Sequence, residues 1–135
     1  MNKRRRFLHM LRKNFKKKRA KTYPSPEVRA LKGCILKCDL GLLLEHTGIY
    51  IGKGKIVGLN RHSEIRIEDP VSFFPPGTNP KSSRIYAACY GNTDEVLISA
   101  AAARRARKKV NQKTPYNVFF NNCHRFTTGC LTGNF

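Results

Sequence analysis

Residues 45–60 read EHTGIYIGKGKIVGLN, two apolar runs around a glycine-rich centre. This pattern predicts a β-hairpin, because β-branched and aromatic residues favour strands and Gly-Lys-Gly favours a tight turn. Side chains alternate between the two faces of a strand, so His46 shares its face with Gly48 and Tyr50, and the isoleucines take the other face. Glycine beside His46 leaves room for another element to approach the imidazole.

The length of the turn determines which residue lies opposite His46. A three-residue turn, GKG at 52–54, places Asn60 there, whereas a two-residue turn places Arg61 there. In the first arrangement the Asn60 carbonyl could hold the imidazole in the tautomer that presents its other nitrogen to a thiol. Both registers are compatible with the sequence, and only the first gives Asn60 this role.

Further short strands flank the hairpin on both sides. GCILKCDL at 33–40 precedes it, and SEIRIED at 63–69 follows it with alternating polar and apolar residues. After a proline-rich loop at 70–83, RIYAACY at 84–90 is typical of one more strand. The order of these segments predicts a meander of antiparallel strands.

The clearest helix is predicted over residues 92–112, NTDEVLISAAAARRARKKVNQ. Asn92 and Glu95 have the spacing of a capping box, alanines fill the middle, and basic residues favour the C-terminal end of the helix dipole. We interpret the arginines as a solvated face. A second helix is expected near the C-terminus, so the predicted fold class is α+β, a small antiparallel sheet packed with helices.

The segment NVFFNNCHRFTTGC at 117–130 places a thiol beside an imidazole. Asn122 is a good N-cap residue, which would make Cys123 the first residue of a helix. The helix dipole lowers the pKa of a thiol at this position, and the free N–H groups there can stabilise an oxyanion. Neighbouring helical residues point about 100° apart, so His124 is a poor base for Cys123. His46 is the candidate base.

The five cysteines also have simpler interpretations. A cysteine is often a small buried apolar residue, which is how we interpret Cys89 and Cys130. Cys34 and Cys38 share a strand face, but a zinc site normally needs four ligands, and no second pair has suitable spacing. We therefore predict neither a metal nor another cofactor. An odd number of cysteines without a secretory signal favours a reducing compartment, here the cytoplasm.

The charge is concentrated at the N-terminus. The chain has 27 Lys and Arg against 8 Asp and Glu, a formal net charge of +19, and residues 1–22 hold 11 of the basic residues and no acid. With the linker TYPSPE they form a predicted basic tail, 1–27, before a domain at 28–135. The tail is interpreted as a solvated disordered segment, a helix peripheral on an anionic membrane, or a nucleic-acid-binding arm. A helix there would align Phe7, Leu8, Leu11 and Phe15.

Two widely separated motifs resemble the lecithin:retinol acyltransferase-like family. They are HTGIYIG within residues 31–60 and NNCHRFTTGC within 116–133, the second being particularly similar to the bacterial branch. Members of that family look like circularly permuted relatives of the NlpC-type papain-like cysteine peptidases. The resemblance implies a Cys123–His46 pair that forms a thioester with an acyl group and passes it to an alcohol, an amine or water.

The resemblance has one clear departure. Where the family usually carries a polar third residue, this chain has Gly58, and Asn60 or His62 is a candidate substitute. The prediction is a thiol-dependent acyltransferase or hydrolase that uses Cys123, His46 and Asn60 on an acyl-bearing small molecule, lipid or peptide. A catalytically inactive binding module of the same fold, or a basic nucleic-acid-binding protein, is the alternative.

Overall fold

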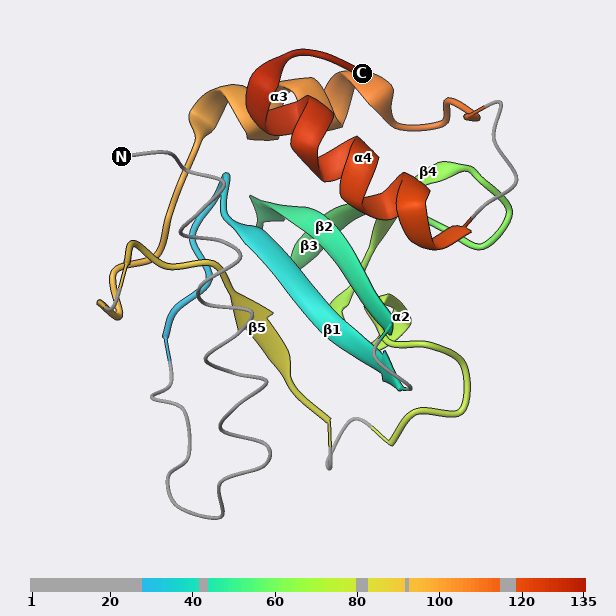
Figure 1. The fold of residues 1–135 in the computed structure, drawn as a ribbon, viewed down its shortest axis with the longest axis horizontal. Helices are drawn as coiled ribbons and strands as arrows, with labels where there is room; N and C mark the ends of the chain where they lie inside the picture. Colours follow the sequence, from blue (N-terminus) through green and yellow to red (C-terminus); the bar gives the residue numbers. More distant parts are fainter. Residues whose placement is uncertain (1–27, 42–43, 80–82, 92, 115–118) are drawn as a thin grey trace.

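The computed structural model describes residues 28–41, 44–79, 83–91, 93–114 and 119–135. Within these residues, five strands form one antiparallel sheet and three helices pack against it (Figure 1). The strands are β1 (Ile35–Gly41), β2 (Leu44–Gly52), β3 (Lys55–Leu59), β4 (Ile65–Glu68) and β5 (Ile85–Ala87), and the helices are α2 (Pro70–Phe73), α3 (Ala100–Lys109) and α4 (Phe119–Thr132). This confirms the α+β class. The predicted tail, with its apolar stripe, lies outside the described residues.

The strand order in the sheet is β4-β3-β2-β1-β5. Strands β1 to β4 form the predicted meander, and β5 returns to pair antiparallel with β1. The short helix α2 lies within the segment that the sequence predicted to be loop. It begins where the Asp69 carboxylate accepts the backbone N–H of Ser72 at 2.7 Å, with Pro70 in the first turn.

The β2–β3 hairpin adopts the register predicted for a three-residue turn, with Gly48 paired to Gly58. The turn itself differs from the predicted three-residue turn. Gly52 pairs with Lys55 after a one-residue irregularity, and the two residues between them turn with φ values of 53° and 70°. A two-residue turn of this conformation matches the twist of the strands, and the β-bulge supplies the extra residue.

The two faces of the sheet are covered differently. The face toward α3 and α4 carries most of the apolar core, including Ile49 and Ile51 of β2, and α4 packs across β2 and β3. The face toward α2 carries a smaller cluster around Phe73, against which Tyr50 packs. The alternation predicted for β2 is therefore confirmed, and His46 belongs to the α2 face.

Helix α3 begins later than the sequence indicated. Its N-cap is Ser99, whose hydroxyl accepts the backbone N–H of Ala102 at 3.2 Å, whereas Asn92 lies outside the described residues. The intervening residues are extended: Val96 bridges to Cys89, and Ile98 bridges to Cys34. β-Branched residues favour this extended pairing, and the alanine run carries the helix alone.

Candidate active site

Helix α4 carries Cys123 in its second turn. The helix begins at Phe119, so the prediction that Asn122 caps it and that Cys123 is its first residue is wrong. Only the first four N–H groups of a helix lack a partner within the helix, and four helical residues, 119–122, precede Cys123. The helix terminus is therefore not what sets the electrostatics of the Cys123 thiol, and its surroundings on the sheet become decisive.

The sulfur lies against the edge of β2. Among the described residues, the β2–β3 pairs end at Gly48–Gly58, whereas β2 continues to pair with β1 as far as its first residue. In the part of β2 that precedes Gly48, the Cys123 Sγ lies 3.6 Å from the Glu45 carbonyl oxygen and accepts the backbone N–H of Thr47. The thiol is fully buried, so these backbone groups are a fixed part of its environment.

A pair of threonines holds α4 in this position. The Thr47 hydroxyl of β2 meets the Thr127 hydroxyl of α4 at 3.2 Å, and both side chains are buried. Thr127 lies 3.2 Å from the Cys123 carbonyl oxygen and 3.0 Å from that of His124, to which its hydroxyl can donate. These contacts fix the turn of α4 that carries the thiol relative to the strand that carries His46.

His46 is the side chain that reaches the sulfur. It shares a hydrogen bond with Cys123, although the two residues are far apart in sequence. The imidazole is buried and packs against the Phe73 ring at 4.5 Å between centroids. Its Nε2 lies 3.7 Å from a carboxylate oxygen of Glu68, an ion-pair distance that is longer than a hydrogen bond. The structure thus brings together Cys123 and His46, both named from the sequence.

The pKa values of both groups shift in the direction that favours a thiolate beside an imidazolium. Burial alone would raise the pKa of Cys123, but the hydrogen bonds from His46 and from the Thr47 backbone lower it below its usual value. Burial likewise would lower the pKa of His46, but Cys123 and the Glu68 carboxylate raise it to about 9. Cys130, buried on the same helix, shows the opposite behaviour: burial raises its pKa to about 12. The charges of Arg105 and Lys109 oppose this shift but do not overcome burial, which keeps the thiol protonated and inert.

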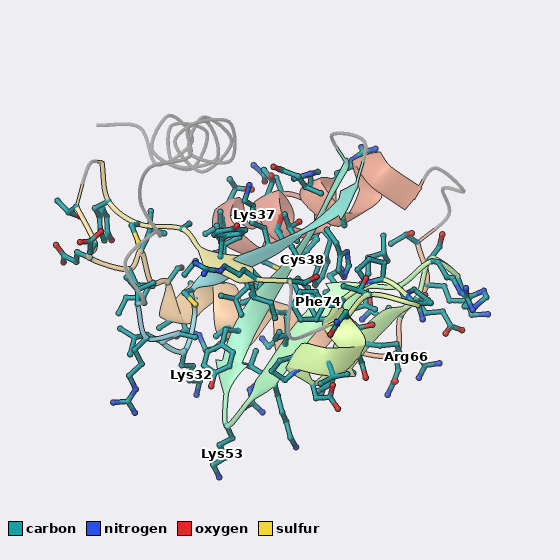
Figure 2. All side chains as sticks on the ribbon, turned by 90° about the horizontal axis from the view of Figure 1, so that it is seen from below. Lys32, Lys37, Cys38, Lys53, Arg66 and Phe74 are labelled. Atoms are coloured by element: carbon teal, nitrogen blue, oxygen red, sulfur yellow. The ribbon has the colours of Figure 1, made fainter. Side chains whose placement is uncertain are left out.

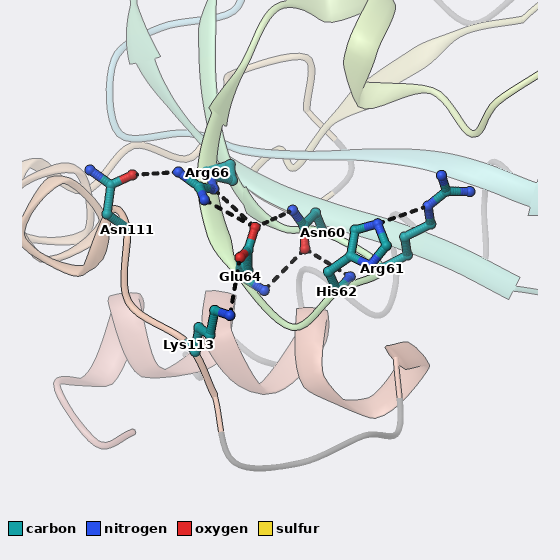
Figure 3. Close-up of polar contacts among 7 residues, drawn as sticks. All are labelled: Asn60, Arg61, His62, Glu64, Arg66, Asn111 and Lys113. Atoms are coloured by element: carbon teal, nitrogen blue, oxygen red, sulfur yellow. Dashed lines mark hydrogen bonds and ion pairs between the residues drawn. The ribbon is translucent and has the colours of Figure 1, made fainter.

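The structure gives Asn60 a different use from the predicted one (Figure 3). Its side-chain oxygen accepts the backbone N–H groups of His62 at 2.8 Å and Glu64 at 3.0 Å, and its amide nitrogen faces the Glu64 carboxylate at 3.4 Å. The His62 ring accepts a hydrogen bond from Arg61 at 3.4 Å. These contacts of Asn60 and His62 shape the turn between β3 and β4, and His46 is not the partner in any of them.

Glu68 is the neighbour of His46 that sequence reasoning missed. The position next to the imidazole on β3 is Gly58, where a Cβ would lie 3.5 Å from the His46 Nε2. Glu68 comes from β4, one strand further away, where it pairs with Ile56. The alternation of SEIRIED places Glu68 on a defined face of its strand. The sequence alone gives neither the register of β4, which pairs Glu68 with Ile56, nor the approach of the His46 ring to Gly58 that brings the two side chains together.

A second group of charges surrounds His124. Lys37 of β1 is only 3% exposed and pairs with the Glu45 carboxylate at 2.7 Å, whereas Lys32 and Lys53 extend outward from the body of the protein (Figure 2). Burial lowers the pKa of His124, and the charges of His46 and Lys37 lower it further, while Glu45 opposes them. His124 is thus disfavoured as a cation beside the Cys123–His46 pair.

Comparison with known proteins places this geometry in a family. No individual curated protein matches the chain significantly. None of the helices described is long and apolar enough to cross a membrane. A scan of protein-family models, however, matches residues 31–135 to the family described as Lecithin retinol acyltransferase, a range that includes the whole sheet, His46 and Cys123. Because this match covers well over half of the sequence, the chain belongs to the lecithin retinol acyltransferase family, whose membership indicates an enzyme of the acyltransferase type.

Proposed function

We propose that this protein transfers acyl groups through a thioester on Cys123, with His46 as the general base. The observation that carries the proposal is the buried hydrogen bond between the two side chains, together with opposite pKa shifts that favour a thiolate and an imidazolium. A nucleophile and a base that are held within hydrogen-bond reach meet the geometric requirement for covalent catalysis. Family membership supports acyl transfer as the reaction class.

The proposed reaction has two steps that restore the starting state. The Cys123 thiolate attacks the carbonyl carbon of an acyl ester, a C–S bond forms, and the ester C–O bond breaks as the leaving alcohol takes a proton from the His46 imidazolium. In the second step an acceptor hydroxyl, amine or water attacks the thioester and gives its proton to the neutral imidazole. The C–S bond breaks and the thiolate is regenerated. Water as acceptor makes the same site a hydrolase.

The proposed substrates are acyl esters of lipids. The family description supports this class. An amide donor would follow the same steps but would need stronger protonation of its leaving nitrogen, which the His46 imidazolium is placed to supply. The described residues assign no chain length to the acyl group, so a short activated ester is a suitable first probe.

His46→Ala is expected to make Cys123 alkylate more slowly at neutral pH. The variant removes the hydrogen bond that most lowers the pKa of Cys123, while the burial that raises it remains. The midpoint of the rate–pH profile should therefore move upward by at least about one pH unit, which is roughly a tenfold loss of rate at pH 7. Iodoacetamide labelling of the Cys123 peptide, followed by mass spectrometry across the pH range, measures the shift.

His62→Ala is the matched control, because His62 is an exposed histidine whose hydrogen bonds remain in the β3–β4 turn. Its labelling profile should coincide with that of the unmodified protein. Coincident profiles for His46→Ala and the unmodified protein would contradict the proposed pair and favour an inactive binding module of the same fold.

We also propose that the basic tail docks the domain on anionic membranes, where an acyltransferase of lipids would meet its substrate. Residues 1–22 carry 11 basic residues and no acid, and each basic residue near such a surface contributes about 1 kcal/mol. A chain that starts at residue 23 should bind phosphatidylserine-containing vesicles at least about tenfold more weakly in a sedimentation assay. Vesicles of pure phosphatidylcholine are the control. Undiminished binding of the shortened chain would exclude the tail as the docking element.

A further inference from the structure

We propose that Glu68 is the positioning residue of the Cys123–His46 pair, and that it acts across the space that Gly58 leaves on the intervening strand. This inference deepens the proposed function and rests on it. The family resemblance led us to expect a polar residue near position 58, and the glycine there leaves that role without an occupant on β3. A carboxylate from the next strand takes its place.

The strand register places Glu68 on the same face of the sheet as His46. Gly48 of β2 pairs with Gly58 of β3, and Gly58 pairs with Arg66 of β4, so these residues and Glu68 lie on the α2 face of the sheet. The His46 ring leans over Gly58, since its Nε2 and Cε1 are the nearest atoms to a Cβ built there. With no side chain between them, the Glu68 oxygen comes within 3.7 Å of Nε2.

The buried surroundings of His46 strengthen its electrostatic interaction with the Glu68 carboxylate. The side chains of His46 and Glu68 are 6% and 17% exposed, so solvent screens their interaction much less than it screens a surface pair. Phe73 covers the ring from α2 at 4.5 Å and restricts its rotation. The titratable groups that act on the imidazole are Cys123 from α4 and Glu68 from β4, with His124 also nearby on α4.

The chemical role follows from the charge of Glu68. When Cys123 loses its proton to His46, a second anion close to the ring stabilises the imidazolium. The Glu68 carboxylate, 3.7 Å from Nε2, supplies that negative charge. An amide at position 60, the arrangement expected from the sequence, would orient the ring without supplying the charge.

Glu68→Gln tests the charge while preserving size and hydrogen-bonding capacity. We expect the pKa of His46 to fall, which NMR of its imidazole protons measures. The rate of Cys123 alkylation at pH 7 should drop about three- to tenfold. Glu68→Asp keeps the charge and should lose less than Glu68→Gln. Glu95→Gln makes the same change of net charge at an exposed position in the loop before α3 and should alter neither readout. Far-ultraviolet circular dichroism verifies that each variant is folded.

The titration of His46 tests the role of Glu68 without any measurement of catalysis. An unchanged pKa of His46 in Glu68→Gln, or equal losses in Glu68→Asp and Glu68→Gln, would overturn the inference. A lowered pKa of His46 in Glu68→Gln supports it even if no acyl substrate is found. Failure of the proposed function would show elsewhere, as alkylation of Cys123 that does not depend on His46.

Discussion

Cys123→Ser is expected to abolish acyl-enzyme formation and to lower turnover of an activated ester by at least about a thousandfold. Serine preserves the size of the side chain, but a hydroxyl stays protonated where the thiol ionises. The contacts that lower the pKa of Cys123, from His46 and the Thr47 backbone, then have no anion to stabilise. Incubation with a p-nitrophenyl ester and intact-protein mass spectrometry should show one added acyl group on the unmodified protein and none on the variant.

Cys130→Ser provides the matched control on the same helix. Cys130 is also fully buried, but burial raises its pKa to about 12, so it should contribute no reactive thiolate. We expect acylation to persist in this variant, with a loss of stability from burying a hydroxyl in an apolar cluster. Equal acylation of the Cys123→Ser variant would place the acyl group on another residue and contradict the proposed nucleophile.

The site could be predicted from sequence where local patterns determine it. Alternation in HTGIYIG predicts His46 on the face of β2 where it lies, whereas hairpin geometry left two β2–β3 registers open, of which the structure has the one expected for a three-residue turn. The start of α4 was misplaced because Asn122 is a strong cap candidate by residue type, whereas Phe119 begins the helix. The capping preference of Asn122 did not determine the start of the helix, so the helix-dipole argument for Cys123 was wrong. The sequence nevertheless identified Cys123 as the thiol that lies beside His46.

The role assigned to Asn60 shows the limit of hairpin reasoning. The register that gave Asn60 its predicted role is the one observed, yet Asn60 follows the last residue of β3, and its carboxamide satisfies backbone N–H groups of the next turn. Asparagine often makes such local hydrogen bonds in turns, and here they compete with the predicted long-range hydrogen bond to His46. Glu68 depends on the pairing of a third strand and on the absence of a side chain at Gly58, a tertiary relation that no local pattern contains.

Gly33→Ala is expected to cause the largest loss of stability among single-methyl additions to the described fold. Gly33 has a φ of 92°, donates its N–H to the Tyr50 carbonyl at 2.7 Å and accepts the N–H of Ser99 at 3.0 Å. A Cβ there would lie 2.4 Å from the Ser99 carbonyl oxygen, a backbone atom of the α3 cap. Left-handed backbone costs about 1–2 kcal/mol for a residue with a Cβ, and overpacking about 1–3 kcal/mol, so the free energy of unfolding should fall by about 2–5 kcal/mol.

Gly52→Ala separates these two contributions. Gly52 has nearly the same φ, 93°, but a Cβ there would meet nothing within 4 Å, so only the backbone cost applies. Urea denaturation of the two variants should therefore show a clearly smaller loss for Gly52→Ala, about 1–2 kcal/mol. Equal losses would mean that the Ser99 backbone moves aside at no cost. The start of α3 would then not be fixed against β2 through Gly33, and the helix layer that holds α4 and Cys123 over the sheet would depend on side-chain packing alone.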